Sequence, residues 1–361
     1  MDAAVGYSGL GEPSDGIDEA LGQLRDFGRA DFALVFATSE YAESVPLLAR
    51  RVRQALGAPT VLGGSTSAVI DATGEHERQP GLGILALRGV RARAALASSA
   101  DDVARLLAEP GALHLVLADP RRFEGGLRDA LFASRGPAVG GGLSGRSEDI
   151  FALADEAAGE GPCALAALGG LEAQVEIAQG AEPNAPWLAV TSSRRNAVLE
   201  LQAMPAAPLL GAHLRALGEA EDQLPNLLFA AMRHPGNAGF TVRPIVGVDE
   251  AAGAILLPDA VAESTELAFA WRETLSAGRA LGAALGRICA DVRPVRALLY
   301  FNCAGRGSSL YLEPDADIAR IRRALPGVPV LGMTSSFELA SQAGALDLLM
   351  YCGVLVALRD G

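Results

Sequence analysis

A short segment that follows an apolar run carries the residue types best suited to chemistry. Asn302, Cys303, Gly305 and Arg306 stand where the run Ala297–Cys303 ends. Gly305 frees backbone amides, and the guanidinium of Arg306 could hold a carboxylate through two parallel hydrogen bonds. The segment therefore suits an amino acid or another small carboxylate as ligand, while a tight turn with a surface arginine is an equally open interpretation.

Cys303 is also a candidate nucleophile, because Arg306 and free backbone amides would favour its thiolate. No histidine lies near it in the sequence. The apolar residues before Cys303 favour a cysteine of the core or of a pocket wall, which is the interpretation we prefer.

Three turns rich in glycine and hydroxyl side chains form a second set of candidates. Each follows a predicted strand and could present backbone amides and hydroxyls to an anion. None contains the GxGxxG pattern of a dinucleotide site, and a strand exit that needs small residues is the alternative. The candidate ligand contacts are Gly63, Gly64, Ser65 and Thr66 in the first turn, Gly140, Gly141 and Ser144 in the second, and Ser335, Ser336 and Glu338 in the third.

The composition excludes several mechanisms. All 30 basic residues are arginine. A Schiff base, a pyridoxal-phosphate anchor, a serine–lysine dyad and a phosphate-loop lysine all need the amine that this chain lacks. The 4 cysteines and 4 histidines form no CxxC, HxH or HxxxH pair, so we predict no metal site. His76 stands in the charged segment Glu75–Arg78, which we expect to be a solvated loop.

Charge and hydropathy indicate a cytoplasmic protein. The formal net charge is −13, which disfavours nucleic acid and anionic membrane as partners. The longest apolar run, Leu348–Leu358, is too short to cross a bilayer as a helix. Met1–Asp18 carries acids and no basic residue, which is unlike a signal peptide, and we expect residues 1–16 to be loosely held.

The elements that must position these residues form three similar units. Each unit comprises an apolar strand, a helix, a strand that follows a proline and leads to a glycine-containing turn (Pro-x-x-Gly in the second and third units), and another apolar strand. Two strands joined by a crossover helix favour parallel pairing, and open α/β sheets bind ligands at the carboxyl ends of their strands. The units span Phe32–Thr38, Val45–Leu56, Pro59–Thr66 and Leu82–Leu87; then His114–Ala118, Gly126–Ala133, Pro137–Ser144 and Cys163–Leu168; then Ala297–Cys303, Ala316–Leu325, Pro329–Ser336 and Leu348–Leu358.

The chain between the second and third units does not repeat this strand–helix–strand pattern. Alternating segments there predict antiparallel strands, and helices are expected within Pro205–Gly218, at Gln223–Met232 and at Thr274–Ala290. The predicted fold class is α/β, with repeated strand–helix–strand units forming mixed, largely parallel sheets and an antiparallel β insertion. The predicted insertion strands are Glu172–Ala178, Trp187–Ser192, Ala197–Gln202, Phe240–Val248, Ala254–Leu257 and Glu266–Trp271.

Four segments in a fixed order resemble the FIST family. Ala33–Thr38 with Gly63–Thr66 is similar to the start of its N-terminal domain, and Val190–Ala206 contains residues like those that close it. Phe240–Asp249 resembles the hallmark strand of its C-terminal domain, and Phe301–Gly307 resembles its F-x-C-x-G-R segment. The resemblance implies a FIST N-terminal-like domain at 20–206 after a segment 1–19, and a FIST C-terminal-like domain at 207–361.

The resemblance also implies a function. Members are intracellular sensory modules proposed to bind small ligands such as amino acids, and a stand-alone member would act through a separate signalling protein. The chain departs from the family at two motifs. Ala316–Asp317 stands where a His-Asp pair is usual, and the third turn keeps only Gly332 and Glu338 of a Gly-rich, Gly-Glu-Ile-ending run.

Our leading hypothesis is a non-catalytic sensor without a cofactor, with a small carboxylate held between the domains against the three turns and Arg306 as its counter-ion. One alternative follows from a haem-binding subset of the family associated with nitric oxide, and it would use His213 or His234 as an axial ligand. The other alternative is a hydrolase or transferase that uses Cys303 or a turn serine.

Overall fold

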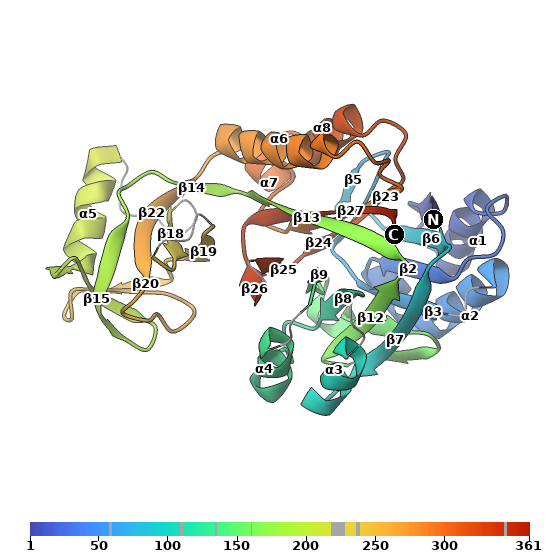
Figure 1. The fold of residues 1–361 in the computed structure, drawn as a ribbon, viewed down its shortest axis with the longest axis horizontal. Helices are drawn as coiled ribbons and strands as arrows, with labels where there is room; N and C mark the ends of the chain where they lie inside the picture. Colours follow the sequence, from blue (N-terminus) through green and yellow to red (C-terminus); the bar gives the residue numbers. More distant parts are fainter. Residues whose placement is uncertain are drawn as a thin grey trace. The chain divides into compact units, whose positions relative to one another are not determined.

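The structure is a computed structural model that describes residues 1–57, 60–108, 112–133, 136–159, 161–217, 228–235, 239–342 and 345–361. The chain folds into two compact units (Figure 1). Unit 1 contains Met1–Ala178, Leu281–Leu348 and Cys352–Gly361, and unit 2 contains Gln179–Ala280 and Leu349–Tyr351. In the described residues, no helix combines the length and the apolar character needed to span a membrane.

Three parallel strand pairs organise unit 1. Their strands are apolar runs buried on both faces, as expected for strands covered by helices. A crossover helix connects the two strands of each pair, and α2 buries Val45, Leu48 and Val52 on one face. The pairs and helices are β2 (Phe32–Ala37), α2 (Val45–Leu56) and β3 (Thr60–Ser65); β8 (Leu113–Ala118), α4 (Gly125–Ala133) and β9 (Ala138–Gly142); and β23 (Ala297–Cys303), α8 (Ala316–Ala324) and β24 (Val330–Ser335).

Each parallel pair has an antiparallel neighbour on its other side. β6 (Leu82–Arg88) pairs with β2, β12 (Cys163–Gly169) with β8, and β27 (Cys352–Asp360) with β23. The prediction of mixed sheets is confirmed, but the prediction that they are largely parallel is wrong. Each crossover helix supplies a single parallel pair, whereas the other strand pairs whose register is described run antiparallel, because the chain reaches them by turns or from other sheets.

The sheets of unit 1 exchange strands. β4 (Ala68–Asp71) follows β3 in the chain but pairs with β24. β10 (Ala152–Ala154) follows β9 but pairs with β3, and β25 (Glu338–Gln342) follows β24 but pairs with β9. The turn after each of β3, β9 and β24 therefore passes from one sheet to another.

Glycine is required at one position in each parallel pair. Gly63, Gly140 and Gly332 face Val35, Val116 and Tyr300 on the neighbouring strands. A Cβ at these glycines would lie 2.7, 1.8 and 2.4 Å from the main-chain carbonyl oxygen of the facing residue. Such distances are far below contact, so these glycines permit the close approach of two strands.

The remaining elements of unit 1 cover or extend these sheets. β1 pairs with β6 along its length, so the expectation of a loose N-terminus is wrong, because the segment completes a sheet edge. Helices α1 and α2 pack on the sheet of β2, β3 and β6, where Ile17, Leu24 and Leu48 join one core (Figure 1). The other elements are β1 (Asp2–Ser8), α1 (Pro13–Gln23), η1 (Ser39–Ser44), β5 (Glu75–Glu77), β7 (Arg91–Ala97), α3 (Ala100–Leu107), η2 (Ser147–Asp149), β11 (Ala157–Gly159), β13 (Leu171–Gln179), α7 (Ser308–Tyr311) and β26 (Ala345–Leu349).

Unit 2 is built on antiparallel strands and the helix α5, and α6 begins within it and continues into unit 1. A predicted helix at Gln223–Met232 is wrong in its last five residues, which belong to strand β18; residues 223–227 lie outside the described part. Leu228–Ala231 is buried throughout, and such a short apolar run has no periodicity that separates strand from helix. The elements are β14 (Ala181–Pro183), β15 (Leu188–Arg194), β16 (Ala197–Leu201), β17 (Met204–Pro205), α5 (Ala206–Leu217), β18 (Leu228–Arg233), β19 (Thr241–Pro244), β20 (Gly247–Asp249), β21 (Ala254–Leu256), β22 (Glu266–Arg272) and α6 (Thr274–Ala290).

Candidate functional site

The three predicted turns meet in unit 1. The hydroxyl of Thr66 donates to the carbonyl of Thr334 at 2.9 Å, and the hydroxyl of Ser144 donates to the same carbonyl. The amide of Ser144 donates to the carbonyl of Ser65 at 3.3 Å. Turns that are far apart in the sequence therefore lie against one another, because the strands that follow them are exchanged between sheets.

The hydroxyl groups of these turns are engaged mainly with the main chain. Ser336 donates to the carbonyl of Leu143 at 3.0 Å, and Ser335 donates to Glu338 at 2.8 Å. Ser65 accepts a hydrogen bond from an amide at 3.3 Å. These contacts tie the turns together. The predicted ligand contacts Gly63, Gly64, Gly140 and Gly141 lie within buried strands next to this junction.

Two cavities adjoin the junction. The first has a volume of about 420 Å³ and the second about 230 Å³. Thr66 lines the first, while Asn302, Cys303 and Arg306 line the second, so four predicted site residues border open space. The first is lined by Thr38, Ser39, Glu40, Thr66, Ser67, Arg78, Gln79, Pro80, Gly145 and Arg146.

Arg78 lies where the cavities join. It lines both of them and also a third cavity of about 500 Å³ beside β5. Its backbone is left-handed, with φ 59°, and its side chain is exposed. The guanidinium donates to the hydroxyl of Ser308 at 3.2 Å, and no carboxylate among the described residues forms an ion pair with it. Its charge is therefore available to a ligand.

A second cation of the first cavity is partly neutralised. Arg146 pairs with Asp149 at 2.8 Å and lies 3.8 Å from Glu40. The hydroxyl of Thr38 holds the pKa of Glu40 below its usual value, although burial opposes this effect. The first cavity thus has an ionised carboxylate on its wall as well as two arginines.

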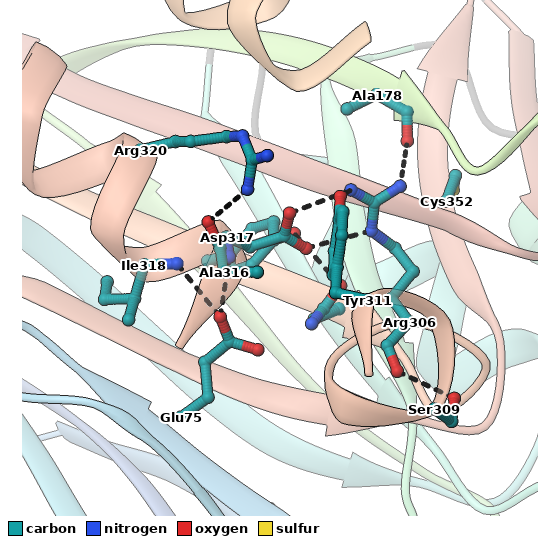
Figure 2. Close-up of polar contacts among 12 residues, drawn as sticks. Glu75, Ala178, Arg306, Ser309, Tyr311, Ala316, Asp317, Ile318, Arg320 and Cys352 are labelled. Carbon is teal, nitrogen blue, oxygen red and sulfur yellow. Dashed lines mark hydrogen bonds and ion pairs between the residues drawn. The ribbon is translucent and has the colours of Figure 1, made fainter. Parts of the chain in front are cut away.

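Arg306 takes part in a buried ion pair beneath this surface. Its Nε and Nη2 atoms each lie 3.1 Å from an oxygen of Asp317, and neither side chain is exposed. Nη1 donates to the carbonyl of Ala178 and Nη2 to the hydroxyl of Tyr311, at 3.3 and 2.8 Å (Figure 2). The alternative of a surface arginine is wrong, because the side chain is buried against Asp317, while the role of Arg306 as a ligand contact stays a prediction.

Glu75 joins the same network from β5. One of its carboxylate oxygens accepts the amides of Asp317 and Ile318, both at 2.9 Å, at the first turn of α8 (Figure 2). Burial, together with the charge of Asp317, raises the pKa of Glu75 to about 7, although these amides act to lower it. In the same segment, Nε2 of His76 lies 2.9 Å from Asp71. The interpretation of Glu75–Arg78 as a solvated loop is wrong for both side chains.

Glu338 forms a second buried acidic group. It is fully buried and accepts hydrogen bonds from the hydroxyl of Ser335 at 2.8 Å and from the thiol of Cys352 at 3.3 Å. Burial raises the pKa of Glu338 to about 8. Glu338 lines none of the three cavities described above, and its role as a ligand contact stays a prediction.

The histidines proposed as haem ligands do not adjoin these cavities. The Nε2 atom of His213 lies 3.1 Å from the side-chain oxygen of Asn184, and its ring stacks on Phe269 at 5.3 Å. His234 is exposed at the end of β18. Neither lines any of the three cavities described above.

Sequence reasoning missed Arg78 and the partner of Arg306. No sequence motif distinguishes Arg78, because its candidate role depends on its position in the walls of three cavities that form only in the folded chain. Asp317 could have been recognised through its place in the family's His-Asp position, which keeps its acid although the histidine is replaced by Ala316.

The comparisons with known proteins agree with the order of the motifs. A family model described as FIST N domain matches residues 31–204, and one described as FIST C domain matches residues 206–341. An uncharacterized protein of Mycobacterium tuberculosis (strain ATCC 25618 / H37Rv) is 28% identical over 248 residues, which are 64% of each chain. One of Mycobacterium bovis is 24% identical over 356 residues, which are 90% of each chain. This chain thus spans just under two thirds of the first relative.

Proposed function

Since the chain belongs to the FIST family, whose domains are generally described as small-ligand sensory domains, we propose that it binds an amino acid or another small carboxylate without transforming it. The site is the first cavity together with the second, which share Ser67 and Arg78. The observation that carries this proposal is the position of Arg78, an arginine without a carboxylate partner in the described chain at the meeting point of the cavities.

The chemistry of the cavity walls suits such a ligand. Arg78 would hold the carboxylate through a bidentate, charge-assisted pair, and the hydroxyls of Ser39 and Ser67 offer further hydrogen bonds. Glu40 would hold the ammonium group of an amino acid. A ligand with both charges therefore complements this site better than a simple acid does.

The hydroxyl contacts support a binding role. In a serine hydrolase the nucleophile is bonded to a general base, whereas Ser144 and Ser336 donate to main-chain carbonyls. A serine that holds the main chain is suited to fixing the shape of a turn. The surroundings of His213 and His234 likewise favour a small-ligand sensor over a haem sensor.

The test is isothermal titration with a panel of the protein amino acids and small organic acids. We expect at least one member to bind, and Arg78→Gln to weaken its binding about 10- to 100-fold, the range of a hydrogen bond to a charged group. Arg323→Gln, which removes an exposed arginine outside these cavities, is the matched control. Equal affinities in the Arg78→Gln and wild-type proteins, or no binding across the panel, would overturn the proposal.

Further proposals follow from the sequence. We propose that the three strand–helix–strand segments are repeats of one unit, each supplying one turn to the site. We also retain the division near residue 206, a cytoplasmic location and a separate signalling protein as the output partner. The predicted absence of nucleic acid and membrane partners rests on the net charge of −13.

A further inference from the structure

Two cysteines face each other across neighbouring strands of unit 1. Strands β23 and β27 pair antiparallel, and the last pair in their register is Asn302 with Gly353. The next position along this register pairs Cys303, the last residue of β23, with Cys352, the first residue of β27. Their side chains therefore project from the same face of the sheet.

The main chain around these cysteines fits a close cross-strand pair. The carbonyl of Cys303 accepts the amide of Arg306 at 2.8 Å, and the amide of Cys352 bonds to the carboxyl of Glu338. Directly opposed residues that do not bond each other have Cα atoms about 4.5 Å apart. This separation lies inside the range of about 4.4–6.8 Å that a disulfide bridges.

A carboxylate from strand β25 contacts the neighbours of Cys303 on both sides. Ser335 on β24 is paired in register with Cys303, so Ser335, Cys303 and Cys352 form a row across three strands. Glu338 accepts a hydrogen bond from each end of this row, from Ser335 at 2.8 Å and from Cys352 at 3.3 Å. The carboxylate thus bridges the two neighbours of Cys303.

Solvent access differs between the two thiols. Cys303 lines the second cavity and is 6% exposed, whereas Cys352 is fully buried. A small oxidant that enters the cavity meets Cys303 first, and Cys352 lies behind it. Neither cysteine forms a disulfide in the structure.

We propose that Cys303 and Cys352 form a thiol switch that small hydroperoxides oxidise to a disulfide. The sulfur of Cys303 attacks the distal peroxide oxygen, the O–O bond breaks, and the departing alkoxide takes the thiol proton, which leaves a sulfenic acid and an alcohol. The sulfur of Cys352 then attacks the sulfur of Cys303, the S–O bond breaks, and water leaves. The two thiols supply the two electrons that reduce the peroxide.

Glu338 is the positioning residue for the second step. It orients the Cys352 thiol through the 3.3 Å hydrogen bond, and its ionised form can accept the thiol proton and pass it to the departing hydroxide. Burial and the charge of Glu338 raise the pKa of the Cys352 thiol well above its usual value.

The test uses the reduced full chain with Cys289→Ser, which removes an exposed thiol. After treatment with tert-butyl hydroperoxide, we expect peptide mapping to recover a Cys303–Cys352 cross-link, with Cys163 still alkylated as a free thiol. With Cys352→Ser added, oxidation should stop at a sulfenic acid on Cys303 that dimedone traps. The proposal is overturned if Cys303 stays reduced under conditions that oxidise Cys289 in the wild type, or if it oxidises without linking to Cys352.

A second variant separates positioning from structural support. In Glu338→Gln, we expect disulfide closure to slow about tenfold while dimedone capture at Cys303 increases, because only the second step needs the carboxylate. A merely structural role would change both steps together and lower the melting temperature, and that result would overturn the role given to Glu338. None of these measurements requires the small carboxylate, so they succeed or fail independently of the proposed ligand site.

Discussion

The ion pair of Arg306 and Asp317 is removed from water at both ends. Although burial acts in the opposite direction, the charge and hydrogen bonds of Arg306 lower the pKa of Asp317. Asp317→Asn would leave a buried guanidinium without its counter-charge. We expect this substitution to lower the free energy of unfolding by about 3–5 kcal/mol in urea denaturation, the usual result of removing one partner of a buried pair.

An exposed ion pair provides the comparison. Asp2 lies 2.6 Å from Arg88, and both side chains are exposed. Asp2→Asn should leave the unfolding free energy almost unchanged, because water and salt screen such pairs. Similar losses in the two variants would mean that burial does not decide the contribution of the Arg306–Asp317 pair.

Glu75 gives the protein a particular dependence on pH. Its pKa is about 7 in the folded protein, above the ordinary value of 4.5, so folding retains a proton that the unfolded chain loses. Its contribution to stability is complete below pH 4.5 and is lost as the pH rises through 7. The glutamine in Glu75→Gln can still accept the two amides, so this variant should lack the dependence.

The measurement is the difference in unfolding free energy between wild type and Glu75→Gln at about pH 5 and about pH 8. Between these values we expect the wild type to lose on the order of 3 kcal/mol relative to the variant, since each pKa unit corresponds to about 1.4 kcal/mol. Glu313→Gln, which removes an exposed carboxyl, is the matched control. A constant difference for Glu75→Gln would show that its carboxyl titrates normally.

At the scale of residues, the sequence indicated which residues belong to the site better than it indicated which side chains they contact. It singled out Arg306, and Asp317 was noted only at the family's His-Asp position, because the pairing of the two depends on how β23 and α8 pack. Cys303 was predicted to be a pocket or core residue. That Cys352 lies opposite it could be inferred only from the register of β23 with β27. Arg78 has no sequence signal, because three separate segments must fold before its cavities exist.

At the scale of elements, the glycines of the parallel pairs can be tested directly. A Cβ at Gly140 would lie 1.8 Å from the carbonyl oxygen of Val116, and neither strand can move without disturbing its sheet. We expect Gly140→Ala to destabilise the protein by about 3 kcal/mol, in the upper range for overpacking. The measurement is the urea midpoint with an unchanged denaturant slope.

Gly126→Ala is the matched control for this substitution. Gly126 lies in helix α4, and a Cβ there would meet nothing within 4 Å. Alanine has the better helix propensity, so this variant should be unchanged or more stable by up to about 1 kcal/mol. If Gly140→Ala behaves like Gly126→Ala, the close approach of β8 and β9 is not a constraint on the fold.

The strands of the parallel pairs could be predicted because they are buried on both faces and have no competing helical period. The partners of β4, β10 and β25 could not, since they are three to five residues long and pair with strands distant in the sequence. Local patterns carry no information about such pairing. The same limit explains why the parallel share of the sheets was overestimated.

At the scale of the whole molecule, the two structural units differ from a single division of the chain. Unit 1 contains both chain ends, and unit 2 is formed mainly by residues 179–280. The matched family domains instead meet between residues 204 and 206.

The whole chain has a formal net charge of −13, and this charge repels an anionic ligand that approaches the protein.

This opposition predicts how association depends on salt. Raising the ionic strength from about 0.01 M to about 0.15 M shortens the screening length from about 30 Å to about 8 Å, which weakens the repulsion from distant acids more than the contact with Arg78. We therefore expect the association rate constant of a simple organic acid, which carries a carboxylate and no ammonium group, to rise about two- to fivefold in stopped-flow measurements. Its uncharged amide analogue should show no such rise. A rate that falls with salt would mean that Arg78 and Arg146 dominate the field at the cavity, outweighing the net charge of −13.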